Sequence, residues 1–175
     1  ILRFAEEVRT VGRLEHPNIV PIHDVGVDAN GEYYFVMKYV EGETLESILE
    51  KLAAGDREYH ARYPFERRVE IMMGVFEAIA YAHSKRIIHR DIKPANVMIG
   101  PYGEVVVMDW GLAREVRGAE PLAGAATSPD ATGKRLWQTQ IGALLGTPAY
   151  MSPEQARGDE LDERSDVYSL SVMFY

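Results

Sequence analysis

A long amphipathic segment at residues 65–84 constrains the fold more than any other feature of this sequence. Apolar side chains recur along it at helical spacing and form one stripe, made of Phe65, Val69, Met72, Met73, Phe76, Ile79, Ala80 and His83. We therefore expect a helix from about Phe65 to Ser84. Shorter apolar runs on either side of it predict strands at Ile19–Val27, Tyr33–Val40, Val97–Ile99 and Glu104–Met108. Turn sequences at 28–31 and 100–103 would join these strands in pairs, as hairpins.

The remaining predicted elements follow from caps, breakers and periodicity. They are helices at Arg3–Leu14, at about 45–52 after a capping Thr44, from Pro153 and from Asp166 onward, with polar loops at 55–64 and 115–138. The second loop is rich in Ala, Gly, Pro, Ser and Thr, which indicates a mobile segment.

Composition excludes several classes of protein. The chain has 175 residues, enough for one domain with a core, and a formal net charge of −8, which disfavours a nucleic-acid binder. It has no cysteine, so disulfides and thiolate metal sites are excluded. No apolar run approaches the ~20 residues that cross a bilayer. We expect a cytosolic, reducing location for this region, whereas the sequence leaves open whether the parent chain is membrane-anchored.

Three polar motifs carry the chemistry. Residues 89–96 read His-Arg-Asp-Ile-Lys-Pro-Ala-Asn, residues 109–111 read Asp-Trp-Gly, and residues 146–154 read Gly-Thr-Pro-Ala-Tyr-Met-Ser-Pro-Glu. A single Asp or Asn in a loop is usually a turn or cap residue. In this order and spacing, however, the motifs resemble those of the protein kinases, and their wording is most similar to that of the bacterial (Hanks-type) serine/threonine kinases.

Phosphoryl transfer needs positioning and charge neutralisation more than covalent chemistry, and the motif residues suit that task. The resemblance implies that Asp91 orients the substrate hydroxyl and that Lys93 places a cation near the transferred phosphate. It implies that Asn96 and Asp109 hold Mg²⁺, an ion that prefers hard oxygen ligands. ATP and Mg²⁺ are therefore the expected cofactors, and proteins phosphorylated on Ser or Thr are the expected substrates.

The resemblance assigns further roles, residue by residue. Besides Lys93, Asn96 and Asp109, the residues expected to bind ATP are Glu7, Met37, Lys38, Val40 and Met98. Thr147 would bond the catalytic Asp and Lys and favour a Ser/Thr substrate, and His89 would be structural. Arg90 marks kinases whose activation loop is ordered by phosphorylation, for which the candidate acceptors are Thr127, Ser128, Thr132 and Thr139. Val11, Ile22, His89 and Trp110 match the apolar stack that links the two lobes, although periodicity alone makes them merely core.

The implied architecture is α+β and two-lobed, in a partial protein kinase domain spanning 1–175. Residues 1–40 would be a small-lobe remnant and hinge, and 41–175 part of a mainly helical large lobe. The activation segment would run from 109 to 154, with an insertion at about 115–138. Neither the Gly-rich loop nor the ATP-binding Lys strand of the family is present, and both ends look like cuts through a longer protein. We expect such a cut to leave apolar surface of the large lobe uncovered.

Two other functions compete with this interpretation. One is a pseudokinase that serves as an interaction module, which intact Asp91, Asn96 and Asp109 disfavour. The other is a small-molecule phosphotransferase of the same fold, which Arg90, Lys93 and the Gly-Thr-Pro to Pro-Glu segment disfavour.

We expect the 175 residues alone to bind ATP weakly and to show no significant kinase activity, because the groups that grip the phosphates in this family are missing from them. A radiolabelled phosphate-transfer assay measures this directly. Robust turnover by the chain alone would refute the expectation.

Overall fold

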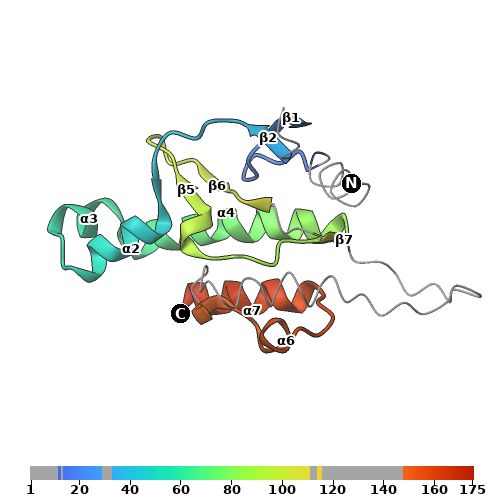
Figure 1. Ribbon diagram of the computed structural model, residues 1–175. Coiled ribbons are helices and arrows are strands. Elements are labelled where there is room, and N and C mark those ends of the chain that lie inside the picture. The colour runs from blue at the N-terminus through green and yellow to red at the C-terminus, as the bar shows by residue number, and fades with distance from the viewer. Residues whose placement is uncertain (1–11, 13, 29–32, 111–113, 116–147) are drawn as a thin grey trace, which may run out of the picture.

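The computed structural model describes residues 12, 14–28, 33–110, 114–115 and 148–175 (Figure 1). They form an α+β arrangement of small sheets and helices. The strands are β1 (Ile22–Val27), β2 (Tyr33–Met37), β3 (Glu43–Thr44), β4 (Ile87–Ile88), β5 (Val97–Ile99), β6 (Val105–Val107) and β7 (Arg114–Glu115). The helices are α2 (Leu45–Ala53), α3 (Arg57–Arg62), α4 (Phe65–Ser84), α6 (Pro153–Arg157) and α7 (Glu163–Phe174). None of the helices in this part of the chain is both long and apolar enough to cross a membrane.

Every strand pair in the described residues is antiparallel, in sheets of order β1-β2, β3-β5-β6 and β4-β7. The chain before β1 is tied to β6 by backbone bonds, because Val20 N donates to Val107 O at 3.0 Å and Val107 N donates to Asn18 O at 2.8 Å. Helix α4 crosses the middle of the molecule, with β5 and β6 on one side and α6 and α7 on the other (Figure 1). This layering brings the loop that follows β4 next to the start of α7.

The core lies along α4, and its most buried line differs from the predicted stripe. Ile71, Val75, Ala78 and Ala82 are fully buried on α4, which packs against β4 and β6 as well as α7. Met73, which we predicted to be on the apolar stripe, is 50% exposed. The prediction shifted the stripe by about one residue, because α4 buries two adjoining faces and a single periodic pattern cannot separate them.

Most predicted elements are present, and the capping prediction is confirmed: the Thr44 side chain accepts a hydrogen bond from Ser47 N at 3.1 Å at the start of α2. The polar loop predicted at 55–64 was wrong, because Asp56 caps the short helix α3 there. The loop predicted from residue 115 begins instead with a strand residue, since β7 pairs with β4. Helix α7 begins before Asp166, at a cap on Asp162. The predicted helix at 3–14 and the rest of the 115–138 loop lie almost wholly outside the described residues.

An apolar groove lies between α4 and α7. It is lined by Phe76, Ile79, Ala80, His83, Val167, Leu170, Ser171 and Phe174. Val167 and Phe174 are 53% and 55% exposed, so large apolar side chains face solvent at this edge.

Replacing Ile71 by Ala should lower the free energy of unfolding by about 2–5 kcal/mol, because it opens a cavity where α4 meets the sheet. Ile71 is 0% exposed, whereas its near neighbour Met73 is 50% exposed. The matched control Met73→Ala should therefore stay within about 0.5 kcal/mol of the wild type. Urea denaturation of the chain measures both, and equal losses would contradict the buried face assigned here.

Candidate active site

The loop between β4 and β5 brings the first three predicted site residues together. Lys93 Nζ lies 2.7 Å from Asp91 Oδ2, and Asn96 Nδ2 donates to Asp91 O at 2.8 Å and to Asp91 Oδ2 at 3.1 Å. A short 3-10 turn at Pro94–Asn96 folds the chain back, so that residues five positions apart face each other. One carboxylate is thus held by a cation and an amide from its own loop.

Asp109 lies beside this loop. Met108 N, one residue before it, donates to Asn96 O at 2.8 Å, which ties the end of β6 to the Asn96 turn. Asp109 itself has a φ of +59°, a left-handed conformation that is costly for a non-glycine residue and is typical of functional sites. Within the described part of the chain, no hydrogen bond engages its carboxylate or the Asn96 carbonyl Oδ1.

These two oxygen donors suit Mg²⁺. The ion favours hard oxygens and usually takes one or two protein carboxylates, with phosphate and water completing its shell. The described residues hold no group of three or more His, Cys, Asp or Glu side chains able to bind a metal without such help. Asn96 and Asp109 are therefore the described residues that could hold Mg²⁺, with phosphate and water completing its shell.

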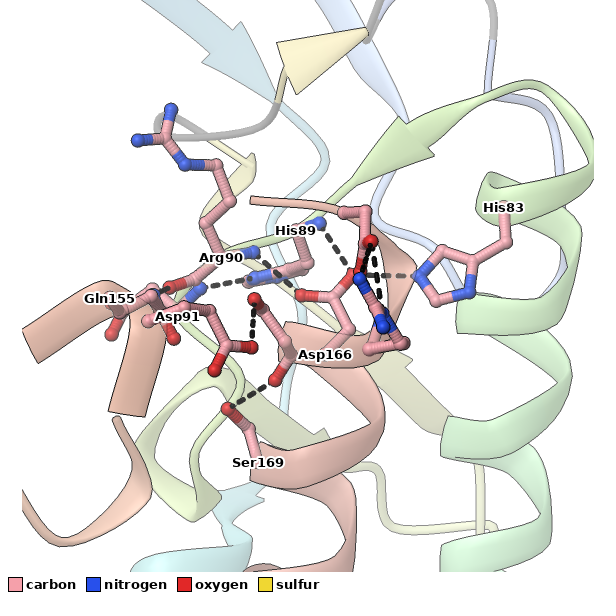
Figure 2. A network of polar contacts seen from close by, with 11 residues as sticks. His83, His89, Arg90, Asp91, Gln155, Asp166 and Ser169 are labelled. Carbon is pink, nitrogen blue, oxygen red and sulfur yellow. Dashed lines mark hydrogen bonds and ion pairs between the residues drawn. The ribbon is translucent and has the colours of Figure 1, made fainter. Parts of the chain in front are cut away.

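Asp166, at the start of α7, binds the backbone of the loop between β4 and β5. Sequence reasoning missed this role. Its side chain is 1% exposed and accepts backbone bonds from His89 N and Arg90 N, both at 2.8 Å (Figure 2). His83 Nε2 of α4 also lies 2.8 Å from Asp166 Oδ2. A buried carboxylate needs such donors, and the available signal was an Asp in the first turn of a predicted helix.

This contact changes the interpretation of His83, which the sequence placed on the apolar stripe of the 65–84 helix. The partner is 83 residues away in sequence, and local spacing could not reveal it. Two other histidines of the described residues contact uncharged groups. His16 stacks on Tyr81 with ring centroids 5.1 Å apart, and His60 bonds the carbonyl of Leu52.

His89 is fully buried between the loop and the strand end. Its Nε2 lies 3.0 Å from Met108 O, and its Nδ1 accepts from Asp91 N at 3.3 Å. These partners select the neutral imidazole that carries its proton on Nε2. Burial lowers the pKa of His89, against the opposing charge of Asp166.

Trp110 packs on His89, with ring centroids 4.5 Å apart, and is 3% exposed. Its indole Nε1 donates to Val107 O at 3.2 Å, so the polar atom of this buried ring has a partner. Ile22 is partly buried against the same core, while Val11 lies outside the described residues.

The predicted hinge follows β2. Lys38 N donates to Pro21 O at 2.9 Å, so only the carbonyl of Lys38 is left to bond a ligand. Val40 N, whose role in adenine binding we predicted, has no backbone acceptor among the described residues. Met37 is 37% exposed, and Met98 is half-buried on β5 opposite Thr44 and Val106.

The remaining predicted site residues stay predictions because they lie outside the described residues. They are Glu7, Thr147 and the four candidate phosphorylation sites Thr127, Ser128, Thr132 and Thr139.

Comparison with known proteins gives the family. The model of the protein kinase domain family matches residues 2–175. The serine/threonine-protein kinase PknD of Protochlamydia amoebophila is 39% identical over 177 residues, covering 99% of this chain and 18% of that protein. The serine/threonine-protein kinase PknB of Mycobacterium leprae is also 39% identical, over 99% of this chain and 25% of its own length. A probable serine/threonine-protein kinase of Streptomyces coelicolor is 37% identical over 99% of this chain and 23% of that protein.

The chain belongs to the protein kinase domain family and is similar to its bacterial serine/threonine members. It spans a quarter or less of the length of these relatives. The family uses ATP and Mg²⁺ in general, which agrees with the oxygen donors described above.

The buried His89 should make stability depend on pH. The unfolded state takes up a proton as the pH falls below the ordinary His value of 6.5, but the folded state resists it, so the free energy of unfolding decreases toward acid pH. The slope from this group approaches about 1.4 kcal/mol per pH unit. Urea denaturation at several pH values measures this slope. The range from roughly 7.5 down to roughly 5 brackets the titration of a free His.

His89→Phe keeps a ring in the core and removes the titrating group, so its slope should be shallower. Met73→Ala, which changes a half-exposed side chain and removes no titrating group, is the control and should keep the wild-type slope. The assignment fails if the His89 variant keeps the wild-type slope as well.

Proposed function

We propose that this chain is part of the catalytic domain of an ATP-dependent protein serine/threonine kinase. The observation that carries the proposal is the convergence of Lys93 Nζ and Asn96 Nδ2 on one oxygen of Asp91, at 2.7 and 3.1 Å. The names of the similar bacterial proteins support the Ser/Thr class of substrate.

Asp91 would orient the substrate hydroxyl. Its Oδ2 is engaged by Lys93 and Asn96, whereas no described residue bonds its Oδ1. That oxygen can accept the hydrogen bond of a Ser or Thr hydroxyl and aim the hydroxyl oxygen at the phosphate. With nucleotide present, Lys93 would also contact the transferred phosphate, where a cation offsets the charge that spreads over the oxygens.

Asn96 Oδ1 and the Asp109 carboxylate would hold Mg²⁺, which neutralises the β- and γ-phosphates when bound. The bond from Met108 N to Asn96 O ties the residue before Asp109 to the Asn96 turn, which supports this shared role. At the hinge, the Lys38 carbonyl and the Val40 amide would bond adenine, between Met37 and Met98.

Thr147 and the four acceptor candidates belong to the same proposal. Thr147 would contact Asp91 and Lys93 and favour Ser/Thr substrates. Phosphorylation at Thr127, Ser128, Thr132 or Thr139 would supply an anion for Arg90, whose guanidinium extends away from Asp166 in Figure 2.

Asp91→Asn in the full-length protein that carries this chain should lower kcat by ~10²–10⁴-fold, since the amide is a poor acceptor for the substrate proton. Glu77→Gln makes the same chemical change on the surface of α4, away from the site, and should leave kcat unaltered.

Asp109→Asn should instead raise the Mg²⁺ concentration required for half-maximal rate.

The assay transfers radiolabelled phosphate from ATP to casein, followed by phosphoamino-acid analysis, with phosphoserine or phosphothreonine expected. Nucleotide binding without any transfer would favour an interaction module. Transfer to small alcohols or amines but not to protein would favour a small-molecule phosphotransferase.

A further inference from the structure

The side chain of Gln155, on α6, contacts two parts of the chain at once. It is 6% exposed, and its amide is used at both ends. Its Oε1 accepts from Ser152 N at 3.1 Å, and its Nε2 donates to Arg90 O at 2.6 Å. Figure 2 shows Gln155 beside the backbone of Arg90, just before Asp91.

The first contact is an ordinary helix cap. Ser152 and Gln155 form a capping box at the start of α6, in which Gln155 N also donates to Ser152 Oγ at 3.3 Å. The second contact is not needed for capping. It reaches 65 residues back in the sequence, to the loop that holds the candidate catalytic carboxylate.

That second contact fixes the peptide unit that precedes Asp91. The carbonyl of Arg90 and the N–H of Asp91 belong to one planar unit. Its oxygen is held by Gln155 and its N–H by His89 Nδ1, at 3.3 Å. On the other side, Arg90 N is held by Asp166 Oδ1 at 2.8 Å, and Arg90 adopts a φ of +74°. Such a conformation persists only where its surroundings hold it.

We infer that Gln155 is a positioning residue for the catalytic loop: by bonding Arg90 O it holds the backbone of Asp91 in place and links that backbone to α6. The inference rests on the kinase function proposed above. Helix α6 begins at Pro153, at the end of the 109–154 segment, so a displacement of that end would reach the backbone beside Asp91 through one hydrogen bond.

Gln155→Glu in the full-length protein separates the two contacts. A Glu at this position completes a capping box with Ser152 as well as Gln does, but its carboxylate cannot donate to Arg90 O. We expect kcat to fall about 10- to 100-fold per folded molecule, with the KM for ATP within about twofold, because a misplaced Asp91 impairs transfer and not nucleotide binding. Gln155→Met, which is uncharged and lacks the same donor, should show the same loss of kcat.

Ser152→Ala is the matched control. It removes the hydroxyl that caps α6 but keeps the backbone N–H that donates to Gln155 Oε1, and it leaves the Nε2 contact to Arg90 O intact. It should therefore lower Tm and spare kcat. Folded, ATP-binding protein is counted by nucleotide titration, so that activity is expressed per competent molecule.

The inference is overturned if both Gln155 variants keep kcat within twofold of an active wild type, or if their losses disappear once activity is expressed per competent molecule. In either case the kinase function stands. An inactive wild type would overturn both the proposed function and this inference, which separates the two failures.

Discussion

The geometry of the candidate site depends on the buried carboxylate of Asp166. Removing a carboxylate from water costs several kcal/mol unless donors surround it. Here the donors are the backbone N–H groups of His89 and Arg90, with the His83 imidazole at the same distance. Because these groups come from the catalytic loop and from α4, satisfying one carboxylate fixes three elements relative to each other. If α7 were shifted or rotated, the Asp166 carboxylate would lose these hydrogen-bond donors.

Around that anchor, the site is held in backbone conformations that the chain would not adopt by itself. Arg90 and Asp109 both have positive φ angles, at a cost of about 1–3 kcal/mol each. The bonds from Asp166 and Gln155 hold the first of these residues, and the bond between Met108 N and Asn96 O holds the chain beside the second. Local strain and its tertiary support are therefore concentrated at the candidate site, where we propose that oxygen donors hold a magnesium–nucleotide complex.

The neutral, buried His89 connects this polar layer to the apolar core. Backbone groups of the site bond its two ring nitrogens, and the ring itself packs on Trp110. The indole N–H of Trp110 donates to the carbonyl of Val107, so the polar atom that this ring brings into the core is paired.

Local sequence determined much of this protein. Periodicity indicated α4 and the short strands, and Thr44 indicated a cap, because each depends on neighbours within a few residues. The motif residues Asp91, Asn96 and Asp109 marked the candidate site. The tertiary structure alone decided the rest: the His83–Asp166 pair, the buried face of α4, and the bond from Gln155 to Arg90. These join groups far apart in the chain, or choose between faces that have the same period. The physical reason is that a buried polar group forms hydrogen bonds with whatever partner the fold brings near. Residue spacing in the sequence does not predict which distant groups become neighbours in space.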